Sequence, residues 1–257
     1  MTVRRSLEGA VGTLTLDRPQ ALNALNAEVI ASLAEGFAAF AAEPACRVVI
    51  LTGAGEKAFA AGADIKEFEA LGPIEAEALA RRTQAVHGAI RDCGKPVIAA
   101  VNGLCLGGGF ELALACDIRI AATSARFGLP EVKLGIVPGA GGIMRLARIA
   151  GAGIARAMAL SGRPIDAQQA LASGIVTELA EPAALADRAR ELAEAIAANG
   201  PYALAQVKAL AESALEAGLE TGLREEARAL ALCFATEDRR EGVAAFVERR
   251  RPAFKGR

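Results

Sequence analysis

The sequence predicts an α/β fold, because short valine- and isoleucine-rich runs alternate with helical segments through the first two-thirds of the chain. These runs are bounded by glycine, proline or aspartate, as buried strands are, and lie at 10–16, 47–53, 95–103 and 117–123. Residues 24–43 carry apolar side chains at helical spacing, and Asn26 is the expected N-cap of that helix. A chain of 257 residues that is 53% apolar can bury a large core around such elements.

The last third of the chain is predicted to be mainly helical. After residue 140 the strand pattern fades except at 174–180, and long amphipathic helices are expected at 183–198, 220–235 and 236–250. Thr236 is the expected N-cap of the last of these. No flexible linker composition separates the two parts. We therefore expect an α/β core in residues 1–195 and a helical region in 196–257, which packs on the core or on a neighbouring subunit.

Composition excludes several classes of protein. The 29 basic and 30 acidic side chains give a net charge of −1, and the pI is near 6.0, so no basic surface for nucleic acid or an anionic membrane is indicated. No apolar run has the length of a membrane helix or a signal-peptide core, so a cytoplasmic location is expected. The five cysteines lack a CxxC pair, which indicates neither a disulfide framework nor a zinc site, and the single histidine, His87, is expected to be structural.

The segment GLCLGGGFE, residues 103–111, combines three consecutive glycines with a glutamate at the start of an apolar helix. Glycine permits positive φ and close approach of other atoms, and the first N–H groups of a helix have no intrahelical acceptor. Such a turn suits an anion or an oxygen that develops negative charge. Because the P-loop and G-x-G-x-x-G patterns are absent, an oxyanion hole is favoured over a nucleotide site. The alternative is that the glycines only allow close packing.

Two further stretches carry candidate chemistry. Small residues at Ala60–Ala63 follow a strand and precede a polar helix start, so their N–H groups could join the first turn around one carbonyl oxygen if the strands are neighbours. Glu131 follows Pro130 and precedes the glycine-rich PGAGG at 138–142. Two carboxylates such as Glu111 and Glu131 in one apolar pocket would repel each other, and one would then keep its proton at neutral pH. A surface or capping role is the alternative for each.

Four segments together resemble the crotonase superfamily, and enoyl-CoA hydratases in particular: AFAAGADIKE, PVIAAVNGLCLGGGFELALACDIRIA, FGLPEVKLGIVPGAGG and ATEDRREGVAAFVERRRPAFKGR. The resemblance runs from about residue 10 to the C-terminus. It implies a crotonase-like spiral of ββα turns followed by a helical C-terminal trimerisation region. It also implies a homotrimer or a hexamer built as a dimer of trimers.

The resemblance also implies the roles of five residues. Backbone N–H groups that map to Ala63 and Gly108 would hold the thioester oxygen. Glu111 would act as base toward water adding at C3, Glu131 would deliver a proton to C2, and Gly139 would help to place the water. The implied activity is reversible hydration of a 2-trans-enoyl-CoA to a 3-hydroxyacyl-CoA. The resemblance implies that this reaction requires no metal or redox cofactor. Coenzyme A is part of the substrate.

The resemblance also implies residues that bind the substrate. Basic side chains should meet the phosphates of CoA, and by the same resemblance Lys255 would reach the ligand of a neighbouring subunit. The expected substrate- and CoA-binding residues are Arg18, Ala21, Ala61, Asp64, Ile65, Lys66, Leu106 and Lys255. The expected acyl-pocket residues are Phe68, Leu71, Phe110, Leu134 and Ile143.

Two other functions compatible with the same fold stay open. A Δ3-Δ2-enoyl-CoA isomerase would use the same oxyanion hole with a single glutamate. A non-catalytic acyl-CoA-binding protein would need neither glutamate. The sequence leaves open the acyl chain and the pathway, with fatty-acid β-oxidation and aromatic or amino-acid catabolism as candidates.

Overall fold

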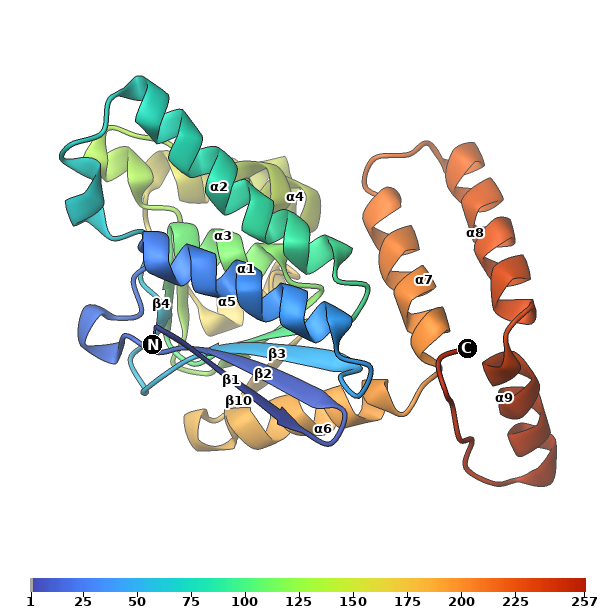
Figure 1. Cartoon of the computed structure of the whole chain (residues 1–257). Helices are drawn as coiled ribbons and strands as arrows, with labels where there is room; N and C mark the ends of the chain where they lie inside the picture. Colours follow the sequence, from blue (N-terminus) through green and yellow to red (C-terminus); the bar gives the residue numbers. More distant parts are fainter. Residues whose placement is uncertain (1) are drawn as a thin grey trace.

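The computed structural model describes residues 2–257, in which the strands form two sheets (Figure 1). The first sheet has the order β1-β2-β3-β5-β7-β10, and all its neighbouring strands are parallel except β1 and β2. Its strands are β1 (Val3–Glu8), β2 (Val11–Leu16), β3 (Val48–Gly53), β5 (Val97–Val101), β7 (Ile118–Ala122) and β10 (Glu178–Ala180). The second sheet has the order β4-β6-β8-β9, comprising β4 (Ala58–Ala60), β6 (Leu104–Leu106), β8 (Arg126–Gly128) and the antiparallel β9 (Ile165–Asp166).

A ββα unit repeats three times along the chain. In each unit a strand of the first sheet is followed by a short strand of the second sheet and then by a helix. The units are β3-β4-α2 (Pro73–Asp92), β5-β6-α3 (Gly108–Ala115) and β7-β8-α4 (Gly142–Ser161). Short 3-10 turns interrupt the chain at Pro19–Ala21, Ile65–Phe68, Glu131–Leu134 and Pro182–Ala184. This succession is the spiral of ββα turns that the sequence led us to expect.

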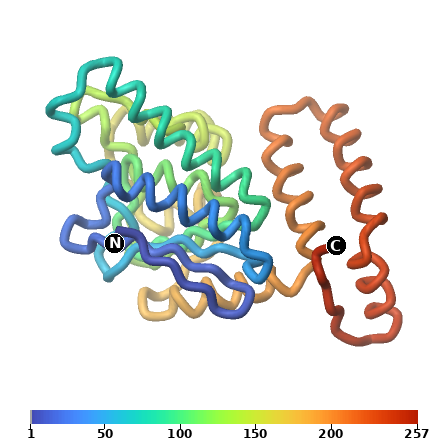
Figure 2. Tube along the Cα trace, viewed as in Figure 1, coloured from blue at the N-terminus to red at the C-terminus, as the bar shows by residue number. Residues whose placement is uncertain are grey.

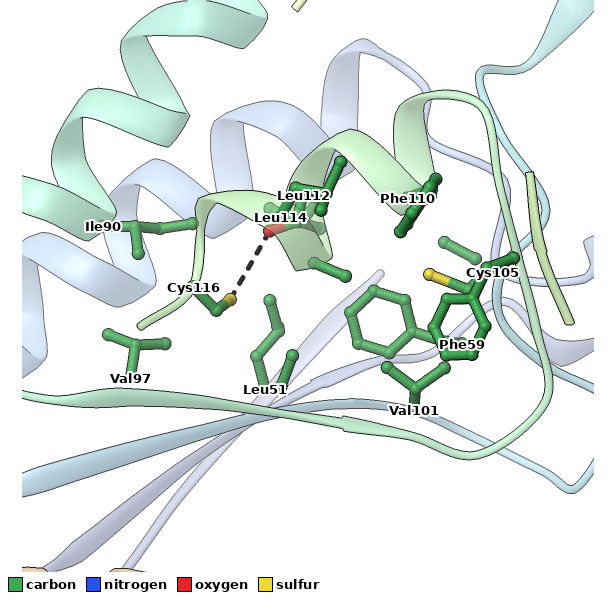
Figure 3. Packing of buried hydrophobic residues seen from close by; sticks show 14 of the residues in the cluster. Leu51, Phe59, Ile90, Val97, Val101, Cys105, Phe110, Leu112, Leu114 and Cys116 are labelled. Atoms are coloured by element: carbon green, nitrogen blue, oxygen red, sulfur yellow. Dashed lines mark hydrogen bonds between the residues drawn. The ribbon is translucent and has the colours of Figure 1, made fainter. Parts of the chain in front are cut away.

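Helices cover both faces of the first sheet. On one face lie α1 (Ala27–Ala42), α2 and α3, and on the other lies α6 (Leu185–Ala197), with α5 (Ala167–Ala172) near the end of the spiral (Figure 1). Figure 3 shows Phe110 of α3 in one hydrophobic cluster with Phe59 of β4 and with Leu51 and Val101 of the central strands. The central strands are buried on both faces and are therefore almost wholly apolar.

The expected helix starts agree with the structure. The side chain of Asn26 accepts a hydrogen bond from Val29 N at 2.9 Å, and that of Thr236 accepts one from Arg239 N at 3.1 Å. The strand expected at 174–180 is wrong in its first half, because only Glu178–Ala180 pair with β7. The sequence patterns also did not indicate β1 or the short strands of the second sheet. Three-residue strands such as β6 are too short to show a hydrophobic period.

The C-terminal helices stand beside the α/β body (Figures 1 and 2). They are α7 (Pro201–Ser213), α8 (Leu219–Phe234) and α9 (Glu237–Glu248). Lys208 ties α7 to the body, because its buried ammonium donates to Ile90 O at 2.7 Å, Lys95 O at 2.9 Å and Asp117 Oδ2 at 2.8 Å. The expected boundary after residue 195 lies in the last turn of α6, and the division into two parts stays a prediction.

Two further observations concern the whole described chain. All five cysteines are free; Cys46, Cys105 and Cys116 are buried, whereas Cys93 and Cys233 are half-buried. No helix within residues 2–257 is both long enough and apolar enough to cross a membrane.

Candidate active site

Three chain turns meet at one edge of the second sheet. Strands β4, β6 and β8 are parallel neighbours, so their carboxyl ends lie at the same edge. The chain leaves these ends into residues 61–64, 107–108 and 129–131. Candidate residues from three distant segments are therefore brought together by strand pairing.

Two backbone N–H groups at this edge are free to bind a ligand. A parallel bridge to Leu25 uses the groups on either side of Ala63: Leu25 N donates to Gly62 O at 2.8 Å, and Asp64 N donates to Leu25 O at 2.9 Å. Gly108 is the first residue of α3, where an N–H has no intrahelical acceptor. Neither Ala63 N nor Gly108 N donates a hydrogen bond within the described part of the chain. A Cβ on Gly108 would lie 3.6 Å from Ala63 N, so the two turns are in contact.

The three consecutive glycines serve different purposes. Gly107 has φ +50°, and a Cβ there would lie 3.0 Å from Glu131 Oε1. Gly109 packs so closely on β4 that a Cβ would overlap the Ala60 carbonyl oxygen and lie 2.6 Å from Ala60 Cβ. Both interpretations of this segment therefore apply: Gly109 permits close packing, and Gly107 and Gly108 shape the site.

Glu111 lies in the first turn of α3, is only 4% exposed and accepts two backbone hydrogen bonds. Its Oε1 atom accepts from Ala140 N and from Gly142 N, each at 2.8 Å. Burial raises the pKa of this carboxyl, while the two N–H donors and the nearby Arg145 act in the opposite direction. The site thus provides Glu111 with hydrogen bonds that favour its charged form.

Glu131 begins the 3-10 turn after β8 and has a different environment. Its Oε2 atom is buried and has no hydrogen-bond partner among residues 2–257. Burial, with a smaller contribution from the negative charge of Glu111, raises the pKa of Glu131 to about 7. Both carboxyls therefore have a raised pKa, but only Glu111 accepts two N–H hydrogen bonds that favour its charged form, whereas Glu131 readily keeps its proton.

The raised pKa of Glu131 predicts a pH-dependent stability. The folded protein binds this proton more tightly than the unfolded chain does, so protonation stabilises the fold at low pH. That stabilisation is lost as pH rises from 4.5 to about 7. We expect the free energy of unfolding to fall across this window, and Glu131→Gln to make the slope shallower. Urea denaturation at a series of pH values measures both slopes; equal slopes would show that Glu131 titrates normally.

A cavity of about 710 Å³ opens beside these groups, within the range usual for ligand sites. It is lined by seven of the expected site residues: Ala61, Ala63, Ile65, Gly108, Glu111, Glu131 and Gly139. Three of the expected acyl-pocket residues also line it, namely Phe68, Leu71 and Leu134. The structure therefore places the candidate oxyanion hole, both carboxyls and an apolar chamber around one space.

Other expected residues lie outside this lining. Phe110 is buried in the core with its ring centroid 5.6 Å from that of Phe127, and Ile143 is partly exposed on α4. The assignment of Phe110 to the acyl pocket is therefore wrong, whereas that of Ile143 stays a prediction. The residues expected near CoA that do not line the cavity are Arg18, Ala21, Asp64, Lys66, Leu106 and Lys255.

Contacts of Arg18, Asp64 and Lys255 show where these outlying residues lie. Arg18 Nη2 lies 3.2 Å from Asp64 Oδ2, and Nη1 donates to Ala24 O at 2.8 Å, so Arg18 braces the turn that carries Ala63. Lys255 lies in the C-terminal tail, where its backbone N donates to Asp238 Oδ1 at 2.6 Å. The structure does not bring Lys255 to the cavity of its own chain.

The two donors to Glu111 were not predicted from the sequence. Ala140 and Gly142 belong to the PGAGG segment, and Gly142 is the first residue of α4. This segment, like residues 103–111, is a glycine-rich start of a helix and therefore offers N–H groups without an intrahelical acceptor. The sequence could not indicate which carboxylate would accept from them.

Comparisons with known proteins identify the family of this chain. The family model described as enoyl-CoA hydratase/isomerase matches residues 6–257. The chain is 42% identical over 251 residues to the short-chain-enoyl-CoA hydratase of Clostridium acetobutylicum, covering 97% of this chain and 96% of that protein. It is 43% identical over 244 residues to the 2,3-dehydroadipyl-CoA hydratase of Escherichia coli, covering 95% and 94%.

A solved structure gives the same result. The crystal structure of enoyl-CoA hydratase from Bacillus anthracis has a TM-score of 0.97 and 40% identity, with all of both chains covered. The resemblance inferred from the motifs and the expected fold class are thus confirmed. The chain belongs to the enoyl-CoA hydratase/isomerase family and has a crotonase-like fold.

Proposed function

We propose that this protein catalyses the reversible hydration of 2-trans-enoyl-CoA thioesters to 3-hydroxyacyl-CoA thioesters. One observation carries the proposal: Glu111, which accepts two N–H hydrogen bonds, and Glu131, whose Oε2 has no partner among residues 2–257, line one cavity with two N–H groups that donate to no group in that part of the chain. An isomerase needs only one acid-base group, whereas adding water across a double bond requires one group to take a proton and another to give one.

The geometry supports a separate role for the two N–H groups and for each carboxyl. The thioester oxygen accepts hydrogen bonds from Ala63 N and Gly108 N, which draws electrons from C3 and stabilises the enolate-like charge. A single such donor is typically worth about 2.7–4 kcal/mol. Glu111 takes a proton from water as the oxygen bonds to C3, and protonated Glu131 gives its proton to C2. Net transfer of one proton from Glu111 to Glu131 then restores the pair for the next cycle.

The cavity lining favours a neutral acyl chain. Apart from Glu111 and Glu131, its ionisable side chain is Glu67, and no lysine or arginine lines it within residues 2–257. The remaining side chains are apolar except for Thr83. A carboxylate on the acyl group would find no cation there, and an unpaired buried charge costs several kcal/mol. We therefore propose neutral, short to medium enoyl groups as substrates.

The test follows the loss of conjugated enoyl-thioester absorbance with crotonyl-CoA and with 2,3-dehydroadipyl-CoA. We expect kcat/KM to be at least about tenfold higher for crotonyl-CoA, a difference of about 1.4 kcal/mol. Higher activity on the dicarboxylic substrate would contradict the neutral-chain assignment. A protein inert toward both substrates that converts a 3-enoyl-CoA is an isomerase, and one that binds CoA thioesters without turnover is a binding protein.

The expected homotrimer or hexamer is part of this proposal. Large apolar side chains are exposed on the C-terminal helices, among them Leu230, Leu232 and Phe234 on α8 and Phe246 on α9. Burial of such a surface between subunits would stabilise an oligomer. Light scattering after size-exclusion chromatography measures the assembly directly. The expected cytoplasmic location and the absence of a metal or redox cofactor stay predictions from the sequence.

A further inference from the structure

We propose that His87 and Arg145 are positioning residues that hold the loop of residues 139–142 and thereby fix the carboxylate of Glu111. The inference rests on the proposed hydration, in which Glu111 is the base. Neither residue lines the cavity, so each would act through the loop and not by touching the substrate.

The side chains of His87 and Arg145 both contact one carbonyl oxygen. Ala140 O lies 2.9 Å from His87 Nδ1 and accepts from Arg145 Nη1 at 2.8 Å. His87 belongs to α2 and Arg145 to α4, so the loop is held between two helices. Gln84, one turn before His87, extends the contact by donating from Nε2 to Gly139 O at 2.8 Å. Two carbonyl oxygens of the loop are thus hydrogen-bonded to side chains of α2 and α4.

N–H groups of the same loop bind the catalytic candidate. Ala140 N and Gly142 N both donate to Glu111 Oε1, and they flank the carbonyl that His87 and Arg145 hold. A rotation of the loop that freed this carbonyl would also turn the N–H groups away from Glu111. The orientation of the carboxylate is therefore coupled to the two side chains behind it.

The protonation of His87 follows from its partner. A carbonyl oxygen can only accept, so Nδ1 must carry the hydrogen. His87 is 1% exposed, and burial, followed by the charge of Arg145, lowers its pKa to about 4. The ring is therefore neutral, and Nε2 has no partner among the residues described. The unpaired, buried Nε2 costs free energy that an apolar side chain would not cost. The feature that histidine has here and an apolar residue lacks is therefore the hydrogen bond from Nδ1 to Ala140 O.

The position of Arg145 depends on Gly141. This glycine has φ +103°, and a Cβ on it would overlap Arg145 Nη1 and lie 3.3 Å from Cζ. The guanidinium therefore folds over a residue that lacks a side chain and reaches the carbonyl before it. Its positive charge also favours the ionised form of Glu111. Arg145 thus supports the base both by geometry and by charge.

The experiment compares matched variants in crotonyl-CoA hydration. His87→Asn keeps an N–H donor at the δ position, whereas His87→Leu has a similar shape without it. Arg145→Lys keeps the charge, whereas Arg145→Met removes it. We expect His87→Leu and Arg145→Met to lower kcat on the order of 10²-fold with KM changed less than about twofold, because a displaced base slows the reaction without weakening binding. His87→Asn and Arg145→Lys should recover at least about tenfold of the lost kcat.

Arg148→Met is the control, since this half-exposed arginine on the same helix pairs with Glu216 at 3.6 Å and does not touch the loop. It should keep the wild-type kcat. Circular dichroism verifies folding. If His87→Leu fails to fold, the comparison of kcat between Arg145→Met and Arg145→Lys tests the inference. Wild-type kcat in His87→Leu and Arg145→Met, or equal losses within each matched pair, would overturn the inference alone. A wild-type protein that hydrates no enoyl-CoA would overturn the proposed function and this inference with it.

Discussion

Replacement of either candidate carboxyl by its amide, Glu111→Gln or Glu131→Gln, should lower kcat for enoyl-CoA hydration by about 10²–10⁴-fold. The glutamine at position 111 can still accept from Ala140 N and Gly142 N through its carbonyl oxygen, so the geometry is kept while the base is lost. The glutamine at position 131 cannot supply the proton for C2. The measurement is the loss of crotonyl-CoA absorbance by variants whose circular dichroism matches that of the parent.

Glu67→Gln is the matched control for these variants. Glu67 lines the same cavity but is exposed, and its Oε1 accepts from Ala27 N at 3.3 Å, away from the carboxyl pair. Its replacement should leave kcat within about twofold of the parent. If Glu131→Gln alone retained full hydration, the two-carboxyl mechanism would be wrong. If hydration were absent throughout but 3-enoyl-CoA isomerisation depended on one glutamate, the isomerase alternative would replace it.

Gly109→Ala should cause the largest loss of stability, at least about 3 kcal/mol in the free energy of unfolding. The added Cβ would overlap the Ala60 carbonyl oxygen, and both groups belong to backbone that is paired or helical. Relief of the overlap requires α3 to move away from β4. Because Gly108 begins α3 and Ala63 lies in the turn after β4, activity should fall as well. Urea denaturation monitored by circular dichroism measures the change in stability.

Gly153→Ala is the corresponding control. Gly153 lies in α4, is exposed and has no atom within 4 Å of the position that a Cβ would take. Alanine is favoured over glycine in a helix by up to about 1 kcal/mol, so this variant should match or exceed the parent in stability. Equal denaturation midpoints for Gly109→Ala and the parent would show that α3 can shift at little cost, contrary to the packing argument.

Local sequence patterns predicted many of the long elements, among them α1, α6, α8 and α9, but did not predict α7. The buried strands β3 and β5 are apolar runs with clear boundaries, and Asn26 and Thr236 mark helix starts by a hydrogen bond that each makes within its own turn. Such features depend on neighbours a few residues away. The strands of the second sheet depend instead on distant segments, because three residues such as Leu104–Leu106 form a strand only when a partner strand lies beside them.

For the site, the sequence by itself determined the residue types: two glutamates, and glycine-rich turns that offer free N–H groups. The motifs around them also determined the family. Only the tertiary structure decided that Ala63, Gly108 and Glu131 share one cavity, because their proximity arises from the pairing of β4, β6 and β8 across more than 60 residues of chain.

Tertiary structure also decided how Glu111 is held. Its two donors lie 29 and 31 residues further along the chain, and the side chains behind them come from α2 and α4. No local pattern encodes those contacts. Propensities act within a few residues, whereas the orientation and pKa of a buried carboxyl depend on every group that packing brings against it.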